Sequence, residues 1–156
     1  MVGVGPGSYT GLRVGIALAQ GLARAQGAQL LGLPSFAWMA FAELAPGEQG
    51  WVVNDARAGA FHAAHYARTE EGLQTLAAPC IVPYNELAGR LGDAPLLLGD
   101  ERARETAARA GLACSRRDLP KADARALLGL ARAEDAGACA CEVRPAEPLY
   151  LRSFGA

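Results

Sequence analysis

The chain has 156 residues, of which 51% are hydrophobic and 20% are charged, and its formal net charge is −1. This composition is typical of one folded domain or two small lobes, and the near-neutral charge argues against a protein whose main task is to bind nucleic acid. Charge is unevenly distributed, because Arg13 and Arg24 are the only charged side chains before Glu43. The first quarter of the chain is therefore expected to be covered by its own fold or by a partner.

The glycine-rich start, MVGVGPGSYTG, runs directly into a helical pattern. MVGV is typical of the end of a buried strand, and residues 10–26 are expected to form a helix capped by Ser8 or Thr10. A helical wheel gives two apolar stripes, Leu12, Ile16, Ala19 and Ala23 in the first and Val14, Leu18, Gly21 and Ala25 in the second. A helix with two apolar faces packs against two neighbours, so the second stripe predicts contact with another chain.

The remaining pattern alternates between strands and helices. Residues 29–33 predict a short strand and residues 36–45 a nearly uncharged helix, followed by a turn-rich break at 45–50. Beyond it we expect a hairpin at 51–67, strands at 76–83, 94–100 and 112–116, and helices at 84–91, 101–111 and 121–137. This order indicates α/β architecture. Pro145 and Pro148 predict an irregular C-terminal tail.

The glycine-rich segment fails both common phosphate-binding patterns. No lysine follows it as in a Walker A loop, since Lys121 is the only lysine, and the glycine spacing does not fit G-x-G-x-x-G. We favour a tight strand-to-helix turn in which glycine supplies positive φ and close packing. The weaker alternative is an anion or nucleotide site at the helix N-terminus. Its candidate residues are Gly7, Ser8, Thr10, Arg13, Asp55 and Arg57.

Asp55 and Arg57 themselves remain open to two interpretations, an anion site or a salt-bridged hairpin turn. The two histidines, His62 and His65, would point to opposite faces of one strand and could not ligate one metal together. The basic stretch from Arg102 to Arg125 is interrupted by acidic residues and is interpreted as a solvated helical face.

No catalytic constellation emerges from the sequence, because no hydroxyl has a persuasive base partner. The four cysteines form no C-x-x-C pair, and Cys139 and Cys141 are too close together for a usual zinc knuckle. We expect reduced thiols, no metal, no cofactor, and a cytoplasmic protein without a membrane span.

Four segments resemble the TsaB (YeaZ) family, the accessory subunit of bacterial tRNA threonylcarbamoyladenosine synthesis. They are GVGPGSYTGLRVGIALAQGLA, LLGLPSFAWMA, VVNDARAGAFHAAHY and AEPLYLRSFGA, in the family's order and over nearly the whole chain. The resemblance implies an actin-like, sugar-kinase and Hsp70-type ATPase fold with two ribonuclease H-like lobes. It divides the chain into the remnant of an incomplete first lobe at 1–46, a second α/β lobe at 51–140 and a tail at 141–156. Compared with family members, the chain is expected to lack an N-terminal segment.

The resemblance also implies a function. Members act as non-catalytic partners of the transferase TsaD, joined by the ATPase TsaE, and meet tRNA only indirectly. Isolated members are expected to form homodimers, and this chain to self-associate through residues 1–44. The expected interface residues on the first long helix are Arg13, Val14, Ala17, Leu18 and Gly21. Alternatives are a metal-free peptidase-like hydrolase and a degenerate nucleotide-binding module.

Overall fold

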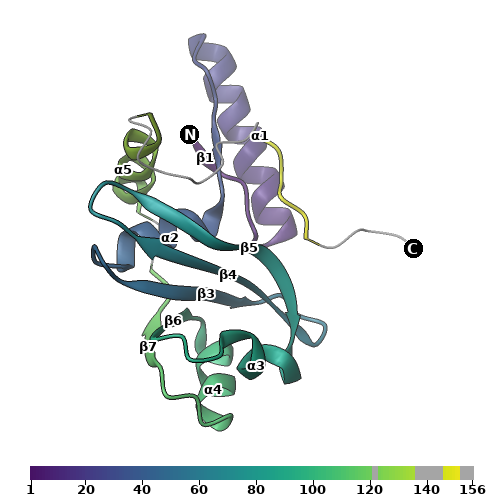
Figure 1. Cartoon of the computed structure of the whole chain (residues 1–156). Coiled ribbons are helices and arrows are strands. Elements are labelled where there is room, and N and C mark those ends of the chain that lie inside the picture. The colour runs from purple at the N-terminus through teal and green to yellow at the C-terminus, as the bar shows by residue number, and fades with distance from the viewer. Residues whose placement is uncertain (121–122, 136–145, 152–156) are drawn as a thin grey trace.

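A five-stranded mixed sheet forms the centre of the molecule (Figure 1). The computed structural model describes residues 1–120, 123–135 and 146–151. The strands are β3 (Gln49–Asp55), β4 (Ala60–Arg68), β5 (Leu73–Pro83), β6 (Leu96–Gly99) and β7 (Ser115–Asp118), in the order β5-β4-β3-β6-β7. β3, β4 and β5 are antiparallel neighbours, whereas β6 and β7 extend the sheet in parallel from β3.

Helices cover both faces of this sheet (Figure 1). Helices α2 (Ser35–Glu43) and α5 (Ala124–Asp135) cover one face, and a 3-10 turn (Tyr84–Glu86) with α3 (Leu87–Leu91) and α4 (Glu101–Arg109) covers the other. Successive side chains of a strand point to opposite faces. Val52 therefore packs with α2 and α5, whereas Trp51 and Val53 pack with α3 and α4.

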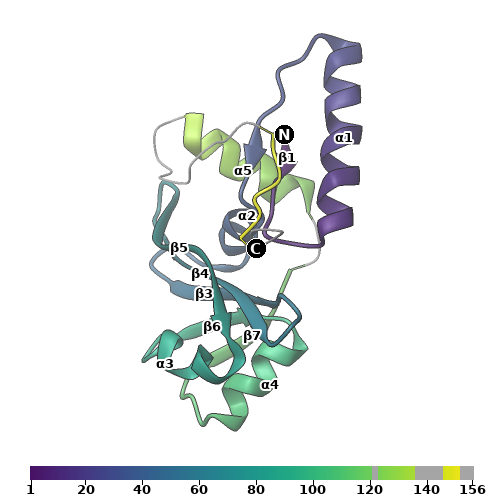
Figure 2. The ribbon, with the colours of Figure 1, turned by 90° about the vertical axis from the view of Figure 1, so that its right-hand side faces the viewer.

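The N-terminal part lies outside this sheet (Figure 2). Strand β1 (Val2–Gly3) pairs in parallel with β2 (Gly32–Leu33), and the 18-residue helix α1 (Tyr9–Gln26) connects them. Ser8 is the N-cap, because its Oγ accepts from the Gly11 N–H at 3.3 Å. Gly27 ends the helix in a left-handed conformation, with φ of 63°.

The expected division at residues 46–51 crosses a continuous hydrophobic core. Phe36 and Trp38 of α2, before this division, pack in one cluster with Val52 and Tyr66, which follow it. The core therefore joins α2 to the five-stranded sheet, and the division into lobes stays a prediction.

Most predicted elements are present, with shifted ends. β5 begins at Leu73, three residues before the expected strand, and the strand expected at 29–33 is reduced to the two residues of β2. The tail residues from 146 to 151 form no regular element, as Pro148 predicts. Cys139, Cys141 and Lys121 lie outside the described residues. Among the residues that are described, no helix is long and apolar enough to cross a membrane.

Candidate functional site

One face of α1 is apolar and exposed. Val14, Leu18 and Leu22 follow one another at a spacing of four and are 62%, 63% and 57% exposed, whereas Ile16 on the opposite side is buried. The second stripe predicted from the sequence therefore faces outward. The five expected interface residues, Arg13, Val14, Ala17, Leu18 and Gly21, are all exposed on α1. Leu22 belongs to the same ridge and was missed, although its i+4 spacing from Leu18 could have identified it.

A polar cavity of about 510 Å³ lies between the N-terminus of α1, the β3–β4 hairpin and the tail. Its lining residues are Pro6, Gly7, Ser8, Tyr9, Thr10, Asn54, Asp55, Ala56, Arg57, His62, Leu149, Tyr150 and Leu151. Five of the six residues of the weak anion site predicted from the sequence, all but Arg13, thus share one cavity. Two segments more than forty residues apart in the sequence are brought together there.

The loop before α1 is held by close packing that requires glycine. Gly5 has φ of 110°, and a Cβ there would lie 2.9 Å from Leu12 Cδ1 and 3.2 Å from the Leu149 carbonyl oxygen. Ser35 clamps the same loop, since its Oγ accepts from the Gly5 N–H at 3.0 Å and its own N–H donates to the Gly5 carbonyl at 2.6 Å. Gly5 therefore has the structural role that the sequence favours for a glycine in this loop.

Asp55 is the centre of a hydrogen-bond network on the hairpin side of the cavity. Its Oδ1 accepts from the Tyr84 hydroxyl at 2.5 Å and from the Arg57 N–H at 2.8 Å, and its Oδ2 lies 3.4 Å from Arg102 Nη1. The Tyr84 hydroxyl contributes most to holding the pKa of the Asp55 carboxyl below its usual value. Asp100 Oδ2 in turn accepts from the Asp55 N–H at 2.5 Å. The carboxylate is therefore ionised and fixed in place.

The turn that follows Asp55 has an uncommon backbone. Arg57 and Ala58 have φ of 59° and 48°, and Gly59 continues the left-handed run at 81°. Left-handed residues other than glycine cost about 1–2 kcal/mol each. The bonds from Ala56 N to Ala60 O at 3.0 Å and from Ala60 N to Arg57 O at 3.2 Å close this turn. The ion pair from Asp55 goes to Arg102 of α4, so the structure combines a cavity wall with a braced hairpin turn.

Arg13 lies beside the cavity and does not line it. Its Nε donates to the Tyr150 hydroxyl at 3.0 Å, and its guanidinium lies 4.5 Å from the centre of the Tyr9 ring. The Tyr9 and Tyr150 rings are 5.4 Å apart. Arg13 therefore connects α1 to the tail.

The two histidines occupy opposite faces of the sheet, as their spacing on β4 predicts. His62 lines the cavity, with its Nδ1 3.0 Å from Asn54 Oδ1. His65 stacks on Trp51 with ring centres 4.8 Å apart, and its buried Nε2 has no hydrogen-bond partner. Burial lowers the pKa of His65 below its ordinary value of 6.5.

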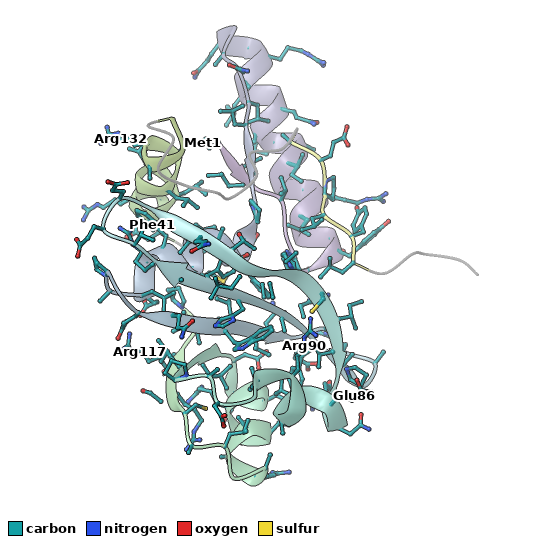
Figure 3. All side chains as sticks on the ribbon, in the orientation of Figure 1. Met1, Phe41, Glu86, Arg90, Arg117 and Arg132 are labelled. Atoms are coloured by element: carbon teal, nitrogen blue, oxygen red, sulfur yellow. The ribbon has the colours of Figure 1, made fainter. Side chains whose placement is uncertain are left out.

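Most arginines of α4 and β7 are paired with carboxylates, whereas Arg116 donates from Nη1 to the Leu112 carbonyl oxygen at 3.1 Å. Arg104 reaches Asp118 at 2.5 Å and Arg109 reaches Glu105 at 3.6 Å. Figure 3 labels Arg117. Arg117 lies on the edge strand β7, and its Nη2 lies 2.9 Å from Glu48 Oε1. The interpretation as a solvated, charge-balanced surface agrees with these pairs.

Thiols and candidate metal ligands show no clustering in the described part of the chain. Cys80 and Cys114 are free and partly buried. Cys80 Sγ lies 3.5 Å from the Ala63 carbonyl oxygen and 3.9 Å from Arg90 Nη2. Within the ranges that the structure describes, no three histidine, cysteine, aspartate or glutamate side chains are close enough to hold a metal ion.

Comparisons with known proteins match this fold. The family model of TsaD, described as tRNA N6-adenosine threonylcarbamoyltransferase, matches residues 1–128. The structure of YeaZ from Pseudomonas aeruginosa is similar with a TM-score of 0.72 and 23% identity, over 96% of this chain and 72% of that one. A protein described as uncharacterized, with similarity to peptidase YEAZ from Pseudomonas aeruginosa, gives 0.68 and 24% over 96% and 71%. No curated protein sequence matches.

The strand order and the likeness to the YeaZ structures define an α/β protein of the actin-like fold, which confirms the fold class predicted from the sequence. The chain belongs to the TsaD family, whose model covers most of its length. The TsaB (YeaZ) assignment made from the four sequence segments is supported by both findings. The family is one of tRNA N6-adenosine threonylcarbamoylation.

Proposed function

We propose that this chain is a non-catalytic docking subunit for tRNA N6-adenosine threonylcarbamoylation that supports a TsaD-like transferase in the cytoplasm. The single observation that carries this proposal is the exposed apolar face of α1, formed by Val14, Leu18 and Leu22. Apolar residues exposed at single positions are ordinary, whereas a continuous ridge of them marks an interaction site.

The composition of this face favours another helix as the occupant. Gly15 and Gly21 lie on α1 with no atom within 4 Å of the position of an added Cβ, so a neighbouring backbone can approach closely there. Leucine and valine side chains at i, i+4 and i+8 form the ridge that packs into a helical groove. Burial of such side chains supplies the favourable free energy of association.

The same face serves two partners in this proposal. With a TsaD-like protein present, α1 packs against that subunit, and in its absence two copies of this chain pair through the same surface. A TsaE-like ATPase joins the complex, and contact with tRNA passes through the partners. Competition between self-association and partner binding follows from the shared surface.

Gly21 allows a sharp test of this face. Gly21→Glu adds a charged side chain to open space, so the isolated chain folds normally while association through α1 loses a desolvated contact. Gly21→Ala is the matched control for the monomer, because it improves helix propensity without adding charge. We expect Gly21→Glu to abolish co-purification with the TsaD-like protein encoded in the same genome. Unchanged binding by a folded Gly21→Glu variant would refute the proposal.

The polar cavity favours a second, weaker function as a degenerate anion or nucleotide site. The supporting observation is the convergence of Ser8, Thr10, Asp55 and Arg57 on one cavity of about 510 Å³. Isothermal titration with ADP and with inorganic phosphate tests it, with Arg57→Ala as the variant. Saturable heat that Arg57→Ala removes would support the site, and absence of heat at millimolar ligand would reject it.

A peptidase-like hydrolase is the remaining alternative. Its candidate hydroxyls have structural partners, because Ser8 Oγ caps α1 and Ser35 Oγ accepts from the Gly5 N–H. A serine nucleophile instead needs a base that withdraws its proton. Peptide turnover that is lost in Ser8→Ala would favour this alternative over docking.

A further inference from the structure

We propose that residues 146–151, here called the strap, bind along α1 and at the same time form one wall of the polar cavity. The contacts that hold the strap on α1 therefore also close the cavity. The strap lies beside α1 although it is far away in the sequence (Figure 1). This inference goes beyond the docking role and does not depend on it.

Two hydrogen bonds anchor the strap to α1, and the Tyr150 ring also packs beside the Tyr9 ring. Gln20 Nε2 donates to the Ala146 carbonyl oxygen at 3.2 Å, and Arg13 Nε donates to the Tyr150 hydroxyl at 3.0 Å. The seven steps from Arg13 to Gln20 rise about 10 Å along a helix. The four steps from Ala146 to Tyr150 span about 13 Å when extended. The two lengths are similar, so an extended strap reaches both anchors while running antiparallel to α1.

Between these anchors the strap is fixed to the loop before α1. The Leu149 N–H donates to the Val4 carbonyl oxygen at 2.7 Å. The Leu149 carbonyl oxygen lies 3.2 Å from the position that a Cβ on Gly5 would occupy, so a side chain at Gly5 would disturb this seat. Leu149, Tyr150 and Leu151 then line the cavity together with Asn54 and His62.

The strap is separable from the rest of the fold. None of its six residues belongs to either hydrophobic core cluster, and Glu147 and Tyr150 are exposed. Its two hydrogen bonds to α1 are exposed, and each changes an equilibrium by about tenfold or less, while Leu149 adds one hydrogen bond to the buried Val4. Segments held in this way open locally without global unfolding. Opening removes the cavity wall and uncovers one flank of α1 in a single step.

A substitution at Gln20 perturbs the strap without changing a residue of the cavity, because Gln20 anchors the strap and does not line the cavity. Gln20→Ala removes the hydrogen bond from Gln20 to the Ala146 carbonyl oxygen. Gln26→Ala is the matched control, since Gln26 is exposed at the end of α1 and makes the same chemical change. Tyr150→Phe is a second variant that removes only the hydroxyl to which Arg13 donates. All are examined in the full chain by NMR.

Two signals report on the proposal. Hydrogen exchange of the Leu149 amide measures strap opening, and the ring proton signal of His62 measures the cavity wall. His65, on the other face of the sheet, is the internal control. We expect Gln20→Ala and Tyr150→Phe to speed exchange at Leu149 about three- to tenfold and to shift the His62 signal. Gln26→Ala should change neither signal, and His65 should stay constant throughout.

Each other outcome overturns the inference. Unchanged exchange at Leu149 in both variants means that Gln20 and Tyr150 do not anchor a strap. Faster exchange at Leu149 with a constant His62 signal means that the strap opens without forming the cavity wall. Equal shifts of His62 and His65 mean a general loosening of the sheet, which the strap does not explain.

Discussion

Truncation of Leu18 to alanine tests the docking face quantitatively. Full burial of a leucine side chain contributes about 1.5–3 kcal/mol, and Leu18 is 63% exposed in the isolated chain. A partner that covers it therefore gains about 1–2 kcal/mol, which corresponds to about a five- to thirtyfold change in Kd. Stability of the monomer should change by less than about 0.5 kcal/mol, because Leu18 makes few contacts there.

The assay measures binding of fluorescently labelled chain to the TsaD-like protein, together with urea unfolding of each variant. Leu128→Ala is the matched control, because Leu128 on α5 is also exposed, at 43%, but lies away from the ridge. We expect Leu18→Ala to weaken binding in the stated range and Leu128→Ala to leave Kd unchanged. Equal effects of the two substitutions, or no effect of Leu18→Ala, would refute the assignment of α1 as the docking face.

Four further predictions follow from local features. Ala58→Gly should stabilise the fold by about 0.5–1 kcal/mol in urea unfolding because it relieves a φ of 48°, whereas Ala110→Gly, at φ −77°, should not. Stability should fall as pH drops below 6.5, because the partly buried His65 binds its proton less readily than the unfolded chain does, and His65→Gln should flatten this slope in urea midpoints between pH 8 and 5.5. Tyr84→Phe should cost about 1 kcal/mol at neutral pH and raise the pKa of Asp55, read from its carboxyl carbon-13 shift, because the hydroxyl bond is lost. The purified chain should hydrolyse neither ATP nor peptide, and turnover that Ser8→Ala or Asp55→Asn abolishes would contradict the docking role.

Local patterns predicted the parts of the structure that depend on neighbouring residues. The two stripes of α1 follow from a period of 3.6, and the structure buries Ile16 while exposing Val14 and Leu18. The faces of His62 and His65 follow from the alternation of a strand. In each case one periodic element carries all the information that the prediction needs.

Contacts between distant segments could not be predicted in this way. The bond between Arg13 and Tyr150 joins residues 137 positions apart, and nothing in either neighbourhood indicates the other. The same holds for Asp55, whose partners Tyr84 and Arg102 come from two other elements. The sequence could identify Gly7, Ser8 and Arg57 separately as candidate residues of an anion site. That they line one cavity depends on how the hairpin, α1 and the tail pack.

The seat of the strap also has a consequence for biosynthesis. Arg13 leaves the ribosome long before Tyr150, because 137 positions separate them. At about 5–20 residues per second, this interval is roughly 7–30 s. During that time the Val4 carbonyl and one flank of α1 have no strap to bind, while the strands of the central sheet, from Gln49 to Asp118, emerge and become available to pair. A nascent chain therefore offers α1 to chaperones or to a subunit assembled during translation before its own tail can reach the helix.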